Sequence, residues 1–265
     1  MYATTYHRPK SLAEAGSLIA SAAEAKLLAG GQTLLPTMKQ RLAAPENLVD
    51  IGKLAELKGI TVDGATVTIG AGTTHADVAA SAEVKRAIPA LAALAGNIGD
   101  PAVRHMGTLG GSVANDDPAA DYPAAVLGLA ATVVTDRRSI TADDFFTGLF
   151  ETALEEGEIL VKIAFPIPTK AGYVKFPNPA SRYAMCGVFV AKTAGGVRVA
   201  VTGAGNGGVF RVPAMEAALA QNWSPDAVAG ITVDPADMLS DIHGSADYRA
   251  NLVTVMAKRA VVAAG

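Results

Sequence analysis

Apolar positions recur at helical spacing at the start of the chain and then give way to short apolar runs. Ser11-Leu12-Ala13-Glu14 has the form of a capping box, and an apolar stripe of helical period follows it. Runs 26–29 and 48–51 are short and apolar, which predicts buried strands. Gly30-Gly31-Gln32 lies between them, and Thr33 can cap a second helix. The first fifty residues are therefore predicted as helix, strand, glycine loop, helix, strand.

The middle of the chain predicts a hairpin, a long helix and a long irregular stretch. Asp63-Gly64 separates two runs rich in β-branched residues, which is a two-residue hairpin signal. An alanine-rich helix is expected from near His75, capped by Thr74, through Ile88 to Ala95. Residues 96–121 are rich in Gly, Pro, Asp and Asn, so we expect an irregular loop there. Ordered loops of this length in compact domains are usually functional.

The last third of the chain predicts a second group of strands and a closing helix. Pro166, Pro168 and Gly172 mark a boundary, and runs 188–191 and 197–202 flank a glycine turn. Ser245 is expected to cap a final helix. The face of that helix expected to be buried carries Tyr248, Leu252, Val255, Met256 and Val262. We predict the α+β class with mixed sheets.

Composition disfavours several classes of function. Half of the residues are hydrophobic and 18% are charged, so a substantial core is possible. The net charge is −3 and no Lys/Arg run occurs, which disfavours a nucleic-acid partner. The longest apolar run, Ala124–Val134, is too short to span a bilayer, and residues 1–10 lack a signal-peptide core. We expect a cytoplasmic protein with no integral membrane segment.

Metal-ligating and nucleophilic side chains are sparse. The single cysteine, Cys186, can form neither an internal disulfide nor a thiolate metal cage. The four histidines are scattered and pair with no carboxylate at metal-ligand spacing. Asp116-Asp117 is expected to be a solvated turn rather than an acid/base pair. No metal site is predicted on this chain.

The first glycine loop, Ala29-Gly30-Gly31-Gln32-Thr33, joins a predicted strand to a predicted helix. The first N–H groups of a helix have no internal partners and lie at the positive end of its dipole. An anionic phosphate satisfies both, and glycines let the backbone approach it closely. The alternative is a tight strand-to-helix turn without a ligand, because Gly-Gly turns are common.

The second glycine loop, Gly107-Thr108-Leu109-Gly110-Gly111-Ser112, lies inside the long irregular stretch. Two such loops suggest a ligand with two phosphates. Asp121 could accept hydrogen bonds from ribose hydroxyls or could cap the helix that begins at Tyr122, and both roles stay open. A third cluster, Gly203 to Gly208, fits G-x-G-x-x-G, but a predicted strand follows it instead of a helix. It is therefore not expected to bind a cofactor.

Together the two loops resemble the two FAD motifs of the flavin subunits of molybdenum hydroxylases. Ala29 to Pro36, with Leu48 to Ile51, resembles the first motif. Arg104 to Gly111, with Asp117-Pro118 and Asp121, resembles the second. Ser181-Arg182-Tyr183 and the segment His243 to Arg249 resemble the family's C-terminal domain. Medium subunits of aerobic carbon-monoxide dehydrogenase type are the nearest resemblance, and xanthine dehydrogenase flavin domains are more distant.

This resemblance implies a fold of the para-cresol-methylhydroxylase flavin type. It predicts an FAD-binding domain over 1–170, with α+β subdomains over about 1–54 and 55–170, and a small C-terminal α+β domain over 171–265. It places the pyrophosphate at the two loops, the ribose at Asp121, and apolar groups or Tyr183 beside the flavin ring. The cofactor residues that it implies are Ala29, Gly30, Gly31, Gln32, Thr33, Leu34, Ile98, Thr108, Leu109, Gly110, Gly111, Ser112, Asp121, Leu160, Lys175 and Tyr183.

Two departures from the family pattern occur in the first loop. Many carbon-monoxide dehydrogenase flavin subunits carry His-Ser where this chain has Gln32-Thr33, which weakens an assignment to carbon monoxide itself. Some covalent flavoproteins of the wider fold attach FAD through a histidine near this loop. Gln32 cannot do so, and non-covalent FAD is expected.

The resemblance further implies an electron-transfer subunit. Iron–sulfur clusters are held by cysteine thiolates, and one cysteine cannot hold them. A small iron–sulfur subunit and a large molybdenum subunit are therefore expected as partners, arranged as a dimer of heterotrimers. Two alternatives stay open: a self-sufficient flavoenzyme of the same fold, and a non-catalytic module that has lost its flavin.

Overall fold

The N-terminal layer is a small parallel sheet with helices beside it. The computed structural model describes all residues, 1–265. The sheet has the order β1-β3-β2, formed by β1 (Thr5–His7), β2 (Ala25–Leu28) and β3 (Asn47–Asp50). Its helices are α1 (Leu12–Ser21) and α2 (Leu34–Lys39). The Ser11 hydroxyl accepts a hydrogen bond from the Glu14 N–H, so the predicted cap of α1 is confirmed.

The middle layer is an antiparallel five-stranded sheet covered by helices. Its order is β4-β5-β10-β6-β7. The strands are β4 (Ile60–Asp63), β5 (Thr66–Gly70), β6 (Thr132–Thr135), β7 (Ser139–Thr141) and β10 (Leu160–Pro166). The predicted hairpin at Asp63-Gly64 is confirmed. The 3-10 helix η1 (Ala55–Leu57) leads into this layer, and α8 (Tyr122–Gly128), α9 (Ala142–Phe145) and the small hairpin of β8 (Phe146–Gly148) and β9 (Glu151–Thr152) complete it.

The prediction of one continuous helix between His75 and Ala95 is wrong. Three short helices occupy this segment: α3 (His75–Ala80), α4 (Ala82–Ala87) and α5 (Pro89–Gly96). The Ser81 hydroxyl accepts a hydrogen bond from the Val84 N–H and so begins a new helix. Pro89 begins the third helix, because proline has no backbone N–H and the first turn of a helix needs none.

The irregular loop predicted over 96–121 is also wrong, because half of it is helical. It contains α6 (Pro101–Met106) and α7 (Leu109–Asn115). Asp100 caps α6 by accepting from the Val103 N–H, and Thr108 caps α7 by accepting from the Gly111 N–H. Glycine and proline therefore begin or border helices here, and residues of this segment line the cavity described below.

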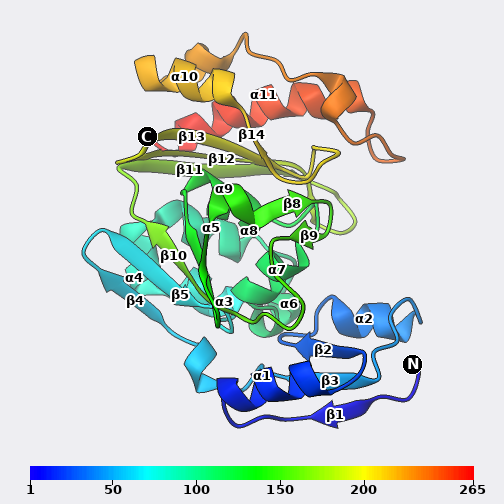
Figure 1. Ribbon diagram of the computed structural model, residues 1–265. Coiled ribbons are helices and arrows are strands. Elements are labelled where there is room, and N and C mark those ends of the chain that lie inside the picture. The colour runs from blue at the N-terminus through cyan, green and yellow to red at the C-terminus, as the bar shows by residue number, and fades with distance from the viewer.

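The C-terminal layer is an antiparallel four-stranded sheet with helices on its outer face. Strands β11 (Lys170–Pro177), β12 (Ala184–Thr193), β13 (Gly196–Thr202) and β14 (Phe210–Arg211) follow in chain order. The outer elements are α10 (Pro213–Gln221), η2 (Pro225–Val228), η3 (Pro235–Asp237) and α11 (Ala246–Ala263). Figure 1 shows the three sheets stacked from the N-terminal layer at the bottom to α10 and α11 at the top.

Strand β12 joins two hydrophobic cores. Phe189 and Ala191 pack into the core of the middle layer, whereas Val188 and Val190 pack into the core beneath α10 and α11. Successive side chains of a strand point to opposite faces, so β12 is covered on both sides. The C-terminal layer is thereby fastened to the middle layer by shared apolar packing.

The final helix is capped by Ser245 as predicted, but its buried face differs from the predicted one. Leu252 and Met256 are buried, whereas Tyr248 is 41% and Val262 is 66% exposed. Val253 and Ala260 take the places expected for the exposed pair. Alanines and apolar residues cover a wide face of α11, so the apolar pattern alone does not define which side of the helix is buried.

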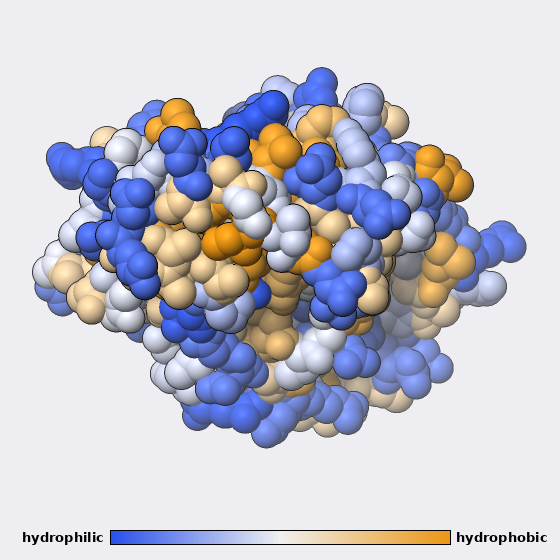
Figure 2. Space-filling model, turned by 90° about the horizontal axis from the view of Figure 1, so that it is seen from above, coloured by the Kyte–Doolittle hydropathy of each residue, from blue (hydrophilic) through white to orange (hydrophobic).

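The sheet content confirms the α+β class, while the domain boundary at residue 170 stays a prediction. No helix combines the length and the apolar character that crossing a bilayer requires. On the face seen in Figure 2, hydrophilic and hydrophobic groups are interspersed and no single apolar patch dominates. The glycine cluster at 203–208 lies between β13 and β14, so the expectation that no helix follows it is confirmed.

Candidate cofactor site

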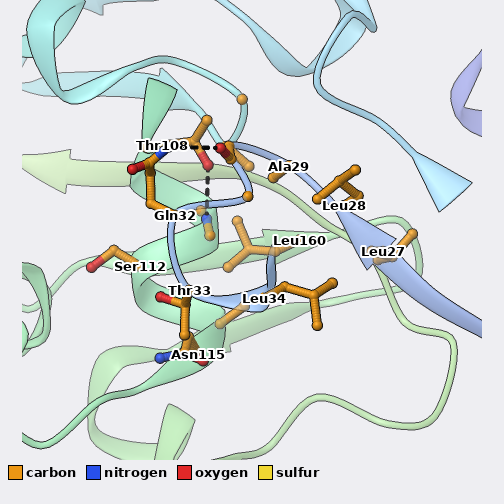
Figure 3. Close-up of a pocket in the computed structure, with 18 of the residues that line it drawn as sticks. Leu27, Leu28, Ala29, Gln32, Thr33, Leu34, Thr108, Ser112, Asn115 and Leu160 are labelled. Atoms are coloured by element: carbon orange, nitrogen blue, oxygen red, sulfur yellow. Dashed lines mark hydrogen bonds between the residues drawn. The ribbon is translucent and has the colours of Figure 1, made fainter. Parts of the chain in front are cut away.

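A cavity of about 890 Å³ lies where the three layers meet. Its walls come mainly from residues 25–34 of the first layer, from ten residues between 107 and 121 and from 154–160 of the middle layer, and from 181–183 of the C-terminal layer. Figure 3 shows the first glycine loop passing in front of α7, with Thr33, Thr108, Ser112 and Asn115 beside it. The volume falls at the upper end of the range typical of small-molecule and cofactor pockets.

The first glycine loop offers free backbone donors to this cavity. None of the N–H groups of Gly30, Gly31, Gln32 and Thr33 donates a hydrogen bond within the chain. Gly31 has φ +70°, a left-handed conformation, and the Thr33 side chain does not cap α2. Four consecutive unpaired donors, followed by a helix N-terminus, suit a phosphate group.

The two glycine loops pack against each other. A Cβ atom at Gly30 would lie 2.1 Å from the Met106 carbonyl oxygen. A Cβ atom at Gly111 would lie 2.8 Å from Thr108 Oγ1 and 3.7 Å from Ala29 Cβ. The absence of side chains therefore lets the loops close on one another as well as on a ligand.

The second loop differs from the first in its hydrogen bonding. The N–H of Leu109 donates to the Thr73 carbonyl at 3.0 Å, and that of Gly110 to the Ala71 carbonyl at 2.8 Å. The Gly111 N–H donates to Thr108 Oγ1 at 3.1 Å. The two loops were expected to act alike, and the structure shows that only the first offers a series of free N–H groups. The second offers the Thr108 N–H and the hydroxyls of Thr108 and Ser112.

Fourteen of the sixteen residues that the sequence implied line the cavity, and Leu109 and Lys175 do not. Leu109 is fully buried in the core of the middle layer. The Lys175 ammonium donates to the Asn97 carbonyl at 2.9 Å and lies 3.0 Å from the Asp121 carboxylate. Lys175 therefore contacts the Asp121 side chain instead of lining the cavity itself.

Asp121 does not cap α8, so that alternative is wrong. Its side chain makes no capping hydrogen bond and accepts instead from the Tyr173 hydroxyl and the Lys175 ammonium. The Asp121 side chain is buried. This burial raises the pKa of its carboxyl, and the neighbouring Lys175 and Tyr173 oppose the rise. Partners from β11 thus hold a carboxylate at the cavity wall.

The apolar and aromatic wall residues lie at separate places around the cavity. Ile98 follows α5, Leu160 begins β10, and Tyr183 follows the turn after β11. Tyr183 is 48% exposed, and partial burial raises the pKa of its hydroxyl. Arg182, in the left-handed region at φ +64°, lines the cavity beside it. The sequence pattern singled out Ser181-Arg182-Tyr183 only as a family resemblance.

Asp116 corrects the expectation of a solvated turn. It is only 2% exposed, has a left-handed backbone at φ +42°, and its Oδ2 atom has no hydrogen-bond partner. Burial, with a smaller effect from Asp117, raises the pKa of Asp116 to about 7. Its neighbour Asp117 lines the cavity. No local signal distinguishes the two carboxylates, because only the fold buries one of them.

His75 and the segment Leu154 to Ile159 also line the cavity and were not among the predicted residues. The histidine begins α3, which the sequence did predict, but nothing in its spacing pointed toward a ligand. Glu155 and Glu158 of the segment are bonded to Arg138, which gives them a structural role.

Comparison with known proteins agrees with this geometry. Residues 2–168 match the family model described as the FAD binding domain in molybdopterin dehydrogenase. The chain is 38% identical to the carbon monoxide dehydrogenase medium chain of Hydrogenophaga pseudoflava over 98% of this chain and 96% of that one. It is 36% identical to the nicotine 6-hydroxylase medium subunit of Paenarthrobacter nicotinovorans, over 99% and 98% of the two chains.

Solved structures show the same similarity in three dimensions. A chain of carbon monoxide dehydrogenase from Hydrogenophaga pseudoflava superposes with a TM-score of 0.87 at 37% identity, covering 99% of this chain and 97% of that one. A chain of quinoline 2-oxidoreductase from Pseudomonas putida 86 gives a TM-score of 0.88 at 29% identity, over 99% and 97% of the two chains. The protein therefore belongs to the family of FAD-binding domains of molybdopterin dehydrogenases and is a flavin subunit of a multi-subunit oxidoreductase.

Proposed function

We propose that this cavity holds one non-covalent FAD, which accepts electrons from iron–sulfur clusters of a partner subunit and passes them to an external acceptor. The observation that carries the proposal is the run of four free N–H groups from Gly30 to Thr33 at the cavity wall. FAD supplies the redox chemistry when bound, and the chain supplies binding, orientation and electrostatics.

The cavity fits the parts of FAD in order. The free N–H groups of the first loop bind the pyrophosphate, together with the N–H and hydroxyl of Thr108 and the hydroxyl of Ser112. Asp121 accepts from ribose hydroxyls with the lone pairs that Tyr173 and Lys175 leave free. Ile98, Leu160 and Tyr183 pack on the ring system. Gln32 lies where some covalent flavoproteins of the wider fold carry a linking histidine, which supports non-covalent FAD.

The remaining redox centres belong to other chains. Cys186 is fully buried, packs in the core beneath α10 and α11, and burial raises the pKa of its thiol to about 12. Such a thiol is apolar core filling and not a metal ligand. We infer a small iron–sulfur subunit and a large molybdenum subunit, assembled with this chain as a dimer of heterotrimers in the cytoplasm.

The carbon monoxide dehydrogenase type is the assignment we propose for the complex. Medium chains of that enzyme from two organisms are 38% and 36% identical over nearly the whole chain. The medium chains of nicotine 6-hydroxylase and glyceraldehyde dehydrogenase are also similar to this chain, at 36% and 33% identity. Substrate choice therefore resides on a partner subunit rather than in this cavity.

Purification from the native host tests the proposal. The chain is expected to copurify with two partners, with iron, molybdenum and flavin, and acid precipitation should release FAD into the supernatant. A chain that purified alone, without metal, and oxidised a substrate through its own flavin would replace the subunit proposal with a self-sufficient flavoenzyme. Flavin retained on the acid-denatured chain would contradict non-covalent binding.

A further inference from the structure

His75 is a cavity residue whose side chain has no partner. It lines the cavity and is 5% exposed, and its ring makes no hydrogen bond within the chain. The Nδ1 atom is fully enclosed without a partner. The small accessible area of the ring therefore includes the Nε2 edge. Nε2 also makes no hydrogen bond, and because an unpartnered polar atom in a nearly buried ring is costly, this position favours a cavity ligand that accepts from it.

The position of the ring is set by the second glycine loop. The His75 N–H donates to the Gly107 carbonyl at 3.0 Å, and Thr74 pairs with Thr108 as an isolated antiparallel bridge. A Cβ atom at Gly107 would lie 2.6 Å from His75 Nε2, so glycine is needed for the ring to lie there. The imidazole thus lies against Gly107, and the N–H of the next residue, Thr108, is free.

The ring is neutral and offers a single N–H donor. Burial, with a smaller contribution from Arg104, lowers the pKa of His75 to about 4. The Tyr122 ring lies beside the imidazole, with the two ring centroids 5.4 Å apart, and its hydroxyl makes no hydrogen bond. Because Nδ1 is enclosed, Nε2 is the ring nitrogen that can present its N–H to the cavity.

We propose that His75 is a further FAD-binding residue, whose Nε2–H donates to a phosphate oxygen of the FAD pyrophosphate from the side of the second loop. This inference rests on the FAD site proposed above. It supplies the second loop with a donor that the Leu109 and Gly110 N–H groups cannot provide, since both are bonded within the protein.

Titration of the full-length apo chain with FAD tests the proposal. His75→Phe should weaken FAD binding about 10- to 100-fold, the usual effect of losing a hydrogen bond to a charged group. His75→Gln, which keeps an N–H donor, should lose less. His105→Gln is the matched control, because His105 is an exposed histidine on α6 that does not line the cavity. His75→Phe with wild-type affinity would overturn the proposal.

A measurement on the unmodified chain covers the case in which His75→Phe fails to fold. With ¹⁵N-labelled histidine, FAD addition should move the Nε2 resonance of His75 and leave that of His105 in place. An unmoved His75 resonance at saturating FAD would contradict the contact. If the wild-type chain bound no FAD at all, the FAD site itself would be wrong, which is a different result from binding that ignores His75.

Discussion

Gly30 and Gly31 are adjacent in the sequence and are glycine for different reasons. At Gly30 there is no room for a side chain, because the Met106 carbonyl lies 2.1 Å from the position of a Cβ atom. At Gly31 the backbone itself has φ +70°, which side chains disfavour. The first is a requirement of contact between the two loops, and the second is a requirement of the turn that frees the N–H groups.

Replacing Gly30 with alanine should separate the two loops. We expect Gly30→Ala to weaken FAD binding at least tenfold and to lower the melting temperature of the apo chain, because a Cβ atom cannot coexist with the Met106 carbonyl. Gly16→Ala is the control, since its Cβ atom would meet nothing within 4 Å. In helix α1 that change should stabilise by roughly 0.5–1 kcal/mol. FAD titration and thermal unfolding measure both effects, and unchanged affinity in Gly30→Ala would remove the loop contact from the site.

Asp116 predicts a pH dependence of stability with a definite sign. Its pKa is raised to about 7 in the folded chain, against about 3.9 unfolded. The stability that the protonated Asp116 carboxyl contributes is fully present below its unfolded pKa and is lost as the pH rises through its folded pKa of about 7. Asp116→Asn should therefore match the wild type near pH 4 and exceed it by a few kcal/mol near pH 8. Asn also tolerates the left-handed backbone.

Urea unfolding at several pH values between 4 and 8 measures this difference. Asp63→Asn, in the exposed hairpin turn, controls for the removal of one negative charge. A constant difference between Asp116→Asn and the wild type across the range would mean that the carboxyl is ionised throughout.

At the level of elements, two loops with similar sequences have different hydrogen bonding. The first loop joins β2 to α2, and its N–H groups from Gly30 to Thr33 donate to no carbonyl of the chain. The second loop begins α7, which lies beside β5, so the Ala71 and Thr73 carbonyls take its N–H groups. Backbone recognition of phosphate is therefore concentrated on one loop, and the other contributes shape and hydroxyls.

Hydrogen exchange should distinguish the loops. On FAD binding we expect strong slowing in peptides covering residues 30–33, because their N–H groups are free in the chain alone. Peptides limited to residues 109–112 should change little, because those N–H groups are already bonded. Mass spectrometry of the apo and FAD-bound chains compares them directly. Equal slowing in both loops would show that the second loop rearranges around the cofactor.

At the level of the whole molecule, β12 couples the C-terminal layer to the cavity. Phe189 packs into the core of the middle layer, and its ring centroid lies 6.1 Å from that of Tyr173, which bonds to Asp121. The chain from Phe189 through Tyr173 to Asp121 links the sheet interior to the cavity wall. Packing between layers thus positions a residue of the proposed cofactor site.

Two truncations on opposite faces of β12 separate stability from this positioning. Phe189→Ala should lower the free energy of unfolding by about 3–5 kcal/mol and also weaken FAD binding. Val190→Ala faces α10 and α11 instead, so it should lower stability without changing FAD affinity under conditions where it remains folded. Unfolding curves and FAD titrations on both variants provide the test. Equal FAD affinity in the two variants would show that packing of Phe189 on Tyr173 does not position the cofactor site.

The sequence by itself determined the features that depend on neighbouring residues. The cap at Ser11, the hairpin at Asp63-Gly64, the cap at Ser245 and the two glycine loops are all in place, although the Glu14 carboxylate accepts from the Lys10 N–H instead of completing the capping box at Ser11. The motifs of those loops also sufficed to identify the family. Even the two errors in helix boundaries had local signals, because Ser81, Pro89 and Thr108 are helix-starting residues that we assigned to other structures.

Only the tertiary structure decided how the polar groups are used. The fold leaves the N–H groups of the first loop without partners and gives those of Leu109 and Gly110 in the second loop carbonyl acceptors, although both sequences are Gly-rich. It paired Asp121 with Lys175, more than fifty residues away, and it buried Asp116 while leaving Asp117 at the cavity. The physical reason is that hydrogen-bond partners and burial are set by residues distant in the chain, whereas caps and turns are set by residues three or four positions away.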